Sequence, residues 1–133
     1  MEKEDYVSLE VAKLLKEKGY DEYCGAYYHL YWMNECTEDE SFEVSSSNYF
    51  KNSNNVYRVG APTLYEASKW LRENHNIYID VKCTAYCKPL NRCDYICEIF
   101  ALSSHQFIDT EIYYKYEEAL NAGILEALKL IWL

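Results

Sequence analysis

Four of the six cysteines in this 133-residue chain lie between Cys83 and Cys97, in the stretch CTAYCKPLNRCDYIC. Sulfurs at this density could hold a metal ion, form disulfides, supply a catalytic thiol or fill part of a hydrophobic core. Both pairs are spaced C-x3-C, whereas tetrahedral zinc sites usually use C-x2-C turns. On an extended chain, C-x3-C separates its sulfurs by roughly 13 Å, so one ion would reach at most a cross-strand pair.

The residues around the cysteines favour the hydrophobic core. Two alternating segments flank the turn, and each places its cysteines on the face that carries its apolar residues. A hairpin centred on Leu90 would set Cys87 opposite Cys93 and Cys83 opposite Cys97. Free cysteine is among the most buried residue types and packs like a small hydrophobe. We therefore expect a helix to cover all four, and zinc, disulfides and a catalytic thiol stay open as alternatives.

The composition indicates a globular, acidic and tyrosine-rich protein. Half of the residues are apolar, and the net charge is −9 from 22 acidic and 13 basic residues. This charge disfavours binding to bulk nucleic acid, whose affinity depends on cations that meet phosphates. The 15 tyrosines cannot all be buried, and tyrosine offers a large contact area at low entropic cost. We expect exposed tyrosines at a binding surface, and self-association to a homo-oligomer fits the same surplus.

The N-terminal residues predict a cytoplasmic protein. The stretch MEKEDYVSLEV is rich in acids and has no apolar core of a signal peptide. The longest apolar runs are too short to span a membrane. In the cytoplasm thiols stay reduced, which counts against the disulfide interpretation.

The periodicity predicts one α+β domain over residues 1–133, with an antiparallel sheet of about four to five strands packed by three helices. The expected helices are 7–18, 63–73 and 116–131. The expected strands are 24–33, 56–59, 77–87, 93–102 and one extended piece within 107–115. A Ser/Asn-rich loop is expected at about 44–55.

Local signals place the ends and inner faces of these elements. Ser8 can cap the first helix, and Gly19 follows its last turn. Thr63 and Glu66 have the spacing of a capping box. The expected inner face of the second helix is Leu64, Ala67, Trp70 and Leu71. The expected inner face of the last helix is Tyr116, Leu120, Ile124, Ala127, Leu128 and Ile131. In the first strand, Ala26, Tyr28, Leu30 and Trp32 share a face.

Established catalytic and cofactor motifs do not occur in the sequence. There is no phosphate-binding loop, dinucleotide fingerprint, nucleophile elbow, zinc-protease helix or EF-hand pattern. The histidines, His29, His75 and His105, are isolated from one another, and His29 is expected to be structural. We therefore expect no metal, no cofactor and no enzymatic activity, although a Cys/His pair that meets only in space stays open.

Three stretches together carry a resemblance: YVSLEVAKLLKEKGYDEYC at 6–24, APTLYEASKWLRENHNIYIDV at 61–81 and YKYEEALNAGILEALKLI at 114–131. They resemble a set of small uncharacterised proteins of gut anaerobic bacteria, their mobile elements and their phages. The set implies no catalytic residues, so none is transferred to this chain. It implies a setting in which small proteins act against host defence, by sequestering nucleotide immune signals or by binding a defence protein.

Two functional hypotheses from different classes follow. The first is a non-catalytic protein that sequesters a small nucleotide-like immune signal, since aromatic rings stack on bases and cations bind phosphates. Its candidate ligand-binding residues are Tyr27, Tyr31, Tyr57, Arg58, Tyr65, Lys69 and Arg72. The alternative is a protein-interaction module that inhibits a host defence protein, which the acidic charge and exposed tyrosines fit equally well. An enzyme is the third hypothesis. The segment 35–60 lies outside the three similar stretches and is where a ligand or partner would be selected.

Overall fold

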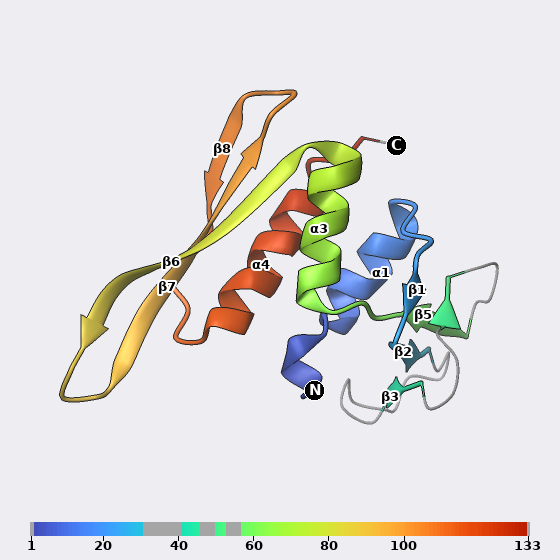
Figure 1. The fold of residues 1–133 in the computed structure, drawn as a ribbon, viewed down its shortest axis with the longest axis horizontal. Coiled ribbons are helices and arrows are strands. Elements are labelled where there is room, and N and C mark those ends of the chain that lie inside the picture. Colours follow the sequence, from blue (N-terminus) through green and yellow to red (C-terminus); the bar gives the residue numbers. More distant parts are fainter. Residues whose placement is uncertain (1, 31–40, 46–49, 53–56, 133) are drawn as a thin grey trace. The chain divides into compact units, whose positions relative to one another are not determined.

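The computed structural model describes residues 2–30, 41–45, 50–52 and 57–132 (Figure 1). The chain is α+β, as predicted, with helices α1, α3 and α4 and antiparallel sheets. It divides into two compact units, Met1–Thr63 and Leu64–Leu133. The expectation of a single domain stays a prediction, and each unit is described by itself.

The first unit contains one α-helix and five short strands among its described residues. These elements are η1 (Lys3–Asp5), α1 (Leu9–Glu17), β1 (Tyr23–Cys24), β2 (Ala26–His29), β3 (Phe42–Val44), β4 (Phe50–Lys51) and β5 (Arg58–Gly60). Strand β2 is central in a sheet of order β3-β2-β5, while β1 and β4 form a separate pair. The expected strand 24–33 is therefore divided at Gly25, and the expected loop contributes β4.

Local signals in the first unit act as predicted. The hydroxyl of Ser8 accepts a hydrogen bond from the backbone N–H of Val11 and caps α1. Gly19 follows the helix with φ +94°, in the left-handed region that favours glycine. Tyr28, which shares a face of β2 with the buried Ala26, is fully buried, and its hydroxyl donates to the carbonyl of Val7 at 2.7 Å. This bond joins the sheet to the segment that leads into α1.

A close contact between Gly60 and Cys24 closes the core of the first unit. A Cβ on Gly60 would meet the sulfur of the buried Cys24 at 2.7 Å, so no larger residue fits without movement. The side chain of Asn52 also binds the backbone at this position. It accepts a hydrogen bond from the N–H of Gly60 at 2.8 Å and donates one to the carbonyl of Tyr20 at 3.1 Å. These contacts connect β5 to β1 and to Tyr20, which precedes β1.

The second unit has two helices and a three-stranded antiparallel sheet. Its elements are α3 (Leu64–His75), β6 (Ile77–Cys87), β7 (Arg92–Ala101), β8 (Gln106–Asp109) and α4 (Tyr116–Leu128). The sheet order is β6-β7-β8, and both helices lie on one side of it (Figure 1). The described strands thus form sheets of two and three strands in place of one sheet of four to five. Pro62 after β5 has no N–H to donate and cannot extend that ladder.

Helix α3 has the predicted inner face, whereas the face of α4 differs from the prediction. Leu64, Ala67, Trp70 and Leu71 of α3 are all buried. In α4 the expected inner residues Tyr116 and Leu120 are exposed and half-buried, and the small residues Ala119 and Gly123 are buried instead. The other buried residues of this segment are Ile124, Ala127, Leu128 and Ile131, as predicted. The helix is rotated so that small side chains face the sheet and allow a close approach.

Gly123 of α4 packs directly against Cys97 of β7. A Cβ on Gly123 would lie 2.1 Å from the sulfur of Cys97 and 2.9 Å from its Cβ. Cys97 has no exposed surface, and this burial raises the pKa of its thiol to about 12. A thiol in this state is inert, because the thiolate is the reactive form.

The register of the β6–β7 hairpin differs from the predicted one. Cys83 lies opposite Tyr95, and Cys97 lies opposite Val81, so Cys83 and Cys97 are not partners. The turn is shorter than expected, since the N–H of Asn91 bonds to the carbonyl of Lys88 at 3.0 Å. A β-bulge between Cys83 and Ala85 then shifts the pairing again towards the tip.

The four clustered cysteines do not share one environment. Cys97 is buried as predicted, but Cys83 is exposed and Cys87 and Cys93 are only partly covered. The prediction of a core position was therefore wrong for Cys83, and Cys87 and Cys93 are less buried than predicted. Eleven residues of β6 span about 36 Å at 3.3 Å each, whereas thirteen residues of α4 span about 20 Å at 1.5 Å each. The helix is too short to cover the whole hairpin. Of the remaining two cysteines, Cys36 lies outside the described residues.

Replacing Gly123 by alanine is expected to destabilise the fold. Glycine to alanine in a helix interior normally stabilises by about 1 kcal/mol. Here the added methyl overlaps the sulfur of Cys97, so we expect a loss of about 1–3 kcal/mol in the free energy of unfolding. Urea denaturation of the wild type and Gly123→Ala measures this difference. Adding Cys97→Ala should restore part of the loss, and a Gly123→Ala variant more stable than wild type would contradict the close contact.

Candidate functional site

A polar and aromatic cluster lies on the exposed face of the sheet β3-β2-β5. Tyr27 projects from β2 on the side opposite the buried Tyr28. The guanidinium of Arg58, on β5, lies 4.9 Å from the centre of the Tyr27 ring, in a cation–π contact. The ring of Phe50 lies 5.2 Å from the same ring, measured between centroids. Antiparallel pairing of β2 with β5 brings Tyr27 and Arg58 together from distant parts of the sequence, and Phe50 comes from β4.

Glu43 of β3 gives this cluster a negative group. The hydroxyl of Tyr27 donates to its carboxylate at 3.0 Å, and the ring Nε2 of His29 is hydrogen-bonded to the same oxygen. The bond from His29, and then that from Tyr27, lowers the pKa of Glu43 below its usual 4.5. Partial burial, followed by the bond to Glu43, raises the pKa of Tyr27. Glu43 is therefore ionised at neutral pH and balances the charge of Arg58. The structural role expected for His29 stays a prediction, and its ring is bonded to Glu43 within this cluster.

The structure brings together some of the seven predicted site residues. Tyr27 and Arg58 are in contact, and the neighbouring Tyr57 is 65% exposed. Tyr31 lies outside the described residues. The predicted residues of α3 are Tyr65, Lys69 and Arg72, which are all exposed and share one face of the helix at positions i, i+4 and i+7. The predicted set is thus divided into one group in each unit.

The most exposed aromatic and apolar residues of the second unit include those around the β6–β7 turn. We call residues 83–94 the arm, because this part of the hairpin extends past the end of α4 (Figure 1). Within it Tyr86 is 58% and Leu90 is 62% exposed. The guanidinium of Arg92 lies 4.1 Å from the ring centre of Tyr114, itself exposed, and the hydroxyl of Tyr86 donates to Asn91 at 3.0 Å.

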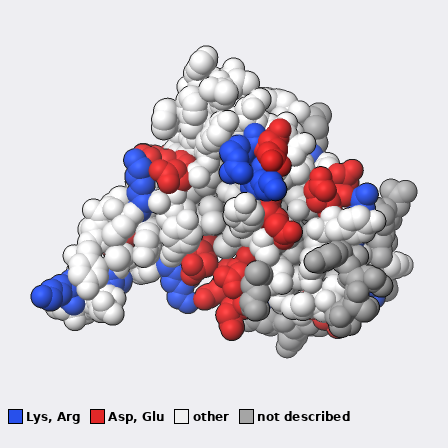
Figure 2. Space-filling model, in the orientation of Figure 1, with Lys and Arg blue, Asp and Glu red and all other residues white. Residues whose placement is uncertain are grey.

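Sequence reasoning did not select the arm as a functional surface. Its alternating pattern is that of a strand with one buried face, and we expected a helix to cover that face. The available signal was the difference in length between an eleven-residue strand and the helix that had to cover it. Figure 2 shows Lys and Arg side chains at the tip of the arm, where Lys88 and Arg92 flank the turn. The tip is positive although the whole chain is acidic.

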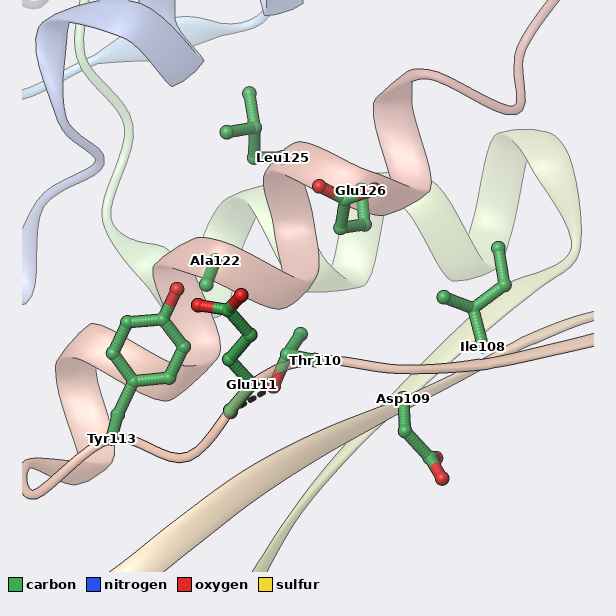
Figure 3. Close-up of a pocket in the computed structure, with 8 residues that line it drawn as sticks. All are labelled: Ile108, Asp109, Thr110, Glu111, Tyr113, Ala122, Leu125 and Glu126. Atoms are coloured by element: carbon green, nitrogen blue, oxygen red, sulfur yellow. Dashed lines mark hydrogen bonds between the residues drawn. The ribbon is translucent and has the colours of Figure 1, made fainter.

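A hollow of about 320 Å³ lies in the second unit between α4 and the segment after β8 (Figure 3). Its lining residues are Ile108, Asp109, Thr110, Glu111, Tyr113, Ala122, Leu125 and Glu126. Glu111 is directed towards α4, whereas Asp109 is turned away from it (Figure 3). Three carboxylates and no cation line the hollow. Its charge therefore disfavours phosphate groups, and none of the predicted ligand-binding residues contributes to it.

Within the described ranges, no three His, Cys, Asp or Glu side chains are grouped closely enough to hold a metal ion. The ring of His75 packs against Trp70 with centroids 4.8 Å apart, and burial lowers its pKa. His105 occupies a turn with φ +54°. The thiol of Cys83 donates to the carbonyl of Ala85 at 3.5 Å, and the neighbouring thiol of Cys93 is the main cause of a raised pKa at Cys83.

Comparisons with known proteins return no match: no protein-family model, no curated protein and no solved structure is similar to the chain. In the part of the chain that the structure describes, no helix has both the length and the apolar composition needed to cross a bilayer.

Glu43 is expected to make stability depend on pH in the acid range. Its folded pKa is lowered from 4.5, so its stabilising contribution is present above the unfolded pKa and is lost as pH falls through the folded pKa. Glu43→Gln should therefore lose less unfolding free energy on acidification than the wild type does. Urea denaturation at a series of pH values measures this. Glu10→Gln, at an exposed position of α1, is the control, and identical pH profiles for wild type and Glu43→Gln would contradict the arrangement.

Proposed function

We propose that this protein is a non-catalytic interaction module of the bacterial cytoplasm whose arm binds another protein. The observation that carries the proposal is the exposure of Tyr86 and Leu90 beside the stacked pair Arg92 and Tyr114. Tyrosine and arginine are enriched among the residues that dominate protein interfaces. Apolar residues scattered singly over a surface are common and do not by themselves mark a binding site.

The arm is held in a conformation suited to binding. The turn is closed by a backbone hydrogen bond from Asn91, and the Asn91 side chain accepts from Tyr86. Stacking on Tyr114 restricts the Arg92 side chain. Its Nε also lies 3.9 Å from Oδ1 of Asp94, within ion-pair distance. Side chains that are already restricted lose less conformational entropy on binding. This supports the arm as a preorganised contact surface.

The charge of the arm indicates the chemistry of its partner. Lys88 and Arg92 flank the exposed Leu90 at the tip. A complementary surface has an apolar hollow for Leu90 and carboxylates at its rim. The resemblance to proteins of gut bacteria and their phages suggests a host defence protein as the partner, which the module would inhibit by occupying its surface.

The cluster around Tyr27 favours a second candidate, the sequestration of a small nucleotide-like signal. Arg58 over the Tyr27 ring, with Tyr57 exposed beside it, combines a cation and aromatic faces of the kind that bind phosphates and bases. Glu43 opposes this function, because its carboxylate lies in the same cluster and would repel a phosphate. We therefore rank this candidate below the protein-interaction module.

Shortening the exposed side chains of the arm is expected to weaken binding of the partner protein. Tyr86→Ala and Leu90→Ala should each weaken binding about tenfold or more, the usual effect of residues that dominate an interface. Affinity capture from host lysate with wild-type and variant protein, followed by titration of the purified partner, measures this. Tyr23→Ala is the matched control, because Tyr23 is 60% exposed but belongs to the first unit. A partner that is bound equally by all variants would place the interface elsewhere.

The nucleotide candidate predicts a thermal shift that depends on Arg58. The purified protein would be screened against cyclic dinucleotides, cyclic ADP-ribose isomers and other NAD-derived nucleotides. A ligand bound at this cluster raises the melting temperature of wild type by stabilising the native state, and Arg58→Ala should abolish the increase. Mass spectrometry of the recovered ligand separates storage from catalysis, since a consumed ligand indicates an enzyme. No shift with any nucleotide would remove this candidate and leave the arm proposal untouched.

A further inference from the structure

Strand β6 has an open edge. It is one of the outer strands of the sheet β6-β7-β8, and in the described part of the chain it pairs with β7 alone. Its eleven residues, IYIDVKCTAYC, include no proline and no glycine. An edge strand of this length presents a row of backbone donors and acceptors that can pair with another strand.

Hydrogen bonds on the far side of β7 show which groups of β6 face that edge. Tyr95 exchanges two backbone bonds with Tyr113, at 2.7 and 2.8 Å, and the carbonyl of Cys97 accepts from Thr110 at 2.9 Å. Tyr95 and Cys97 thus direct their backbone groups away from β6. Because successive residues of a strand alternate sides, the residues between and beyond them, Ile96 and Glu98, direct theirs towards β6.

The same alternation can be followed onto β6. Lys82 lies opposite Ile96 and Asp80 lies opposite Glu98, so Lys82 and Asp80 use their backbone groups to bond β7. The intervening Val81 then points its N–H and C=O at the open edge. Its neighbours at positions 79 and 83 do the same.

We infer that two copies of this chain associate through their β6 edges, antiparallel and about a two-fold axis at Val81, to form one continuous six-stranded sheet. Val81 is the natural centre, because an outward-facing residue can form a hydrogen-bonded pair with its own copy. This register places Asp80 opposite Lys82 of the second copy, and Ile79 opposite Cys83 of the second copy.

Charge complementarity on the uncovered face favours this occupant. Asp80 lies opposite Glu98, which in turn lies opposite Asp109, so three acids are adjacent across the three strands. Like charges directly opposite each other destabilise a sheet. Lys82 pairs with Glu98 at 2.8 Å, and no described cation forms an ion pair with Asp80. Lys82 of the second copy would lie directly across from Asp80, where cross-strand side chains are closest.

The other face of β6 is self-complementary as well. Val81 is half-buried, Ile79 is half-buried and Cys83 is exposed. In the dimer Val81 meets its own copy, and Ile79 meets Cys83 of the second copy, so apolar atoms cover apolar atoms. The bulge after Cys83 ends the regular stretch, which limits the core of the interface to five residues of each copy. The antiparallel arrangement directs the two arms towards opposite ends of the joint sheet. This inference does not depend on the proposed function of the arm.

Two charge reversals test the pairing. Asp80→Lys sets lysine against lysine in a homodimer, and Lys82→Asp sets aspartate against aspartate. We expect each variant alone to dimerise at least about tenfold more weakly than the wild type. A mixture of the two restores opposite charges at both positions, so it should form a heterodimer. Sedimentation velocity over a range of concentrations, under reducing conditions, measures these affinities, and circular dichroism shows that each variant is folded.

Val81→Pro tests the backbone part of the same interface. Proline removes an N–H that points at the open edge and leaves the ladder to β7 complete, so the monomer should fold and dimerisation should be lost. A wild type that is monomeric at every concentration would overturn the inference. So would a dimer that Val81→Pro and both charge reversals leave unchanged, since that dimer would use another surface.

Discussion

The contact between Gly123 and Cys97 determines how the second unit is built. A helix with a larger residue at this position could not lie so close to β7, since the sulfur already occupies the space where a Cβ would be. The small residues Ala119, Gly123 and Ala127 recur at intervals of four along the buried face of α4 and make the approach possible. The first unit uses a similar device, in which Gly60 makes room for the buried sulfur of Cys24.

The same contact explains why part of the hairpin is exposed. Because α4 is fixed over Cys97, it covers the half of β6 and β7 near α3 and leaves the arm outside the core. The exposed residues of the arm and the open edge of β6 both follow from a small helical layer on a long hairpin. Burial makes Cys97 a packing residue with a raised pKa, while Cys83 and Cys93 remain accessible. Cysteines that occupy equivalent positions of the alternating pattern therefore differ in thiol reactivity, because α4 covers Cys97 and does not reach Cys83.

The candidate sites illustrate how far residue types alone can lead. Tyr27 and Arg58 were selected because one is aromatic and the other cationic, and β2–β5 pairing does bring them into contact. The sequence did not reveal that Glu43 would join them, because that depends on β3 pairing with the other side of β2. The carboxylate of Glu43 makes the cluster less suited to a phosphate ligand. The ligand preference therefore depends on the charges that the fold assembles and not on the predicted residues alone.

Local physics was sufficient for the features that depend on neighbouring residues. The cap at Ser8, the left-handed Gly19, the extent of β6 and the inner face of α3 could all be predicted, because each follows from a short-range hydrogen bond, a backbone preference or a regular period. The hairpin register could not be predicted, since a shift of two residues keeps every side chain on its face and leaves the alternation unchanged. Which cysteine is buried was decided only by tertiary structure, because burial depends on where α4 lies and where it ends.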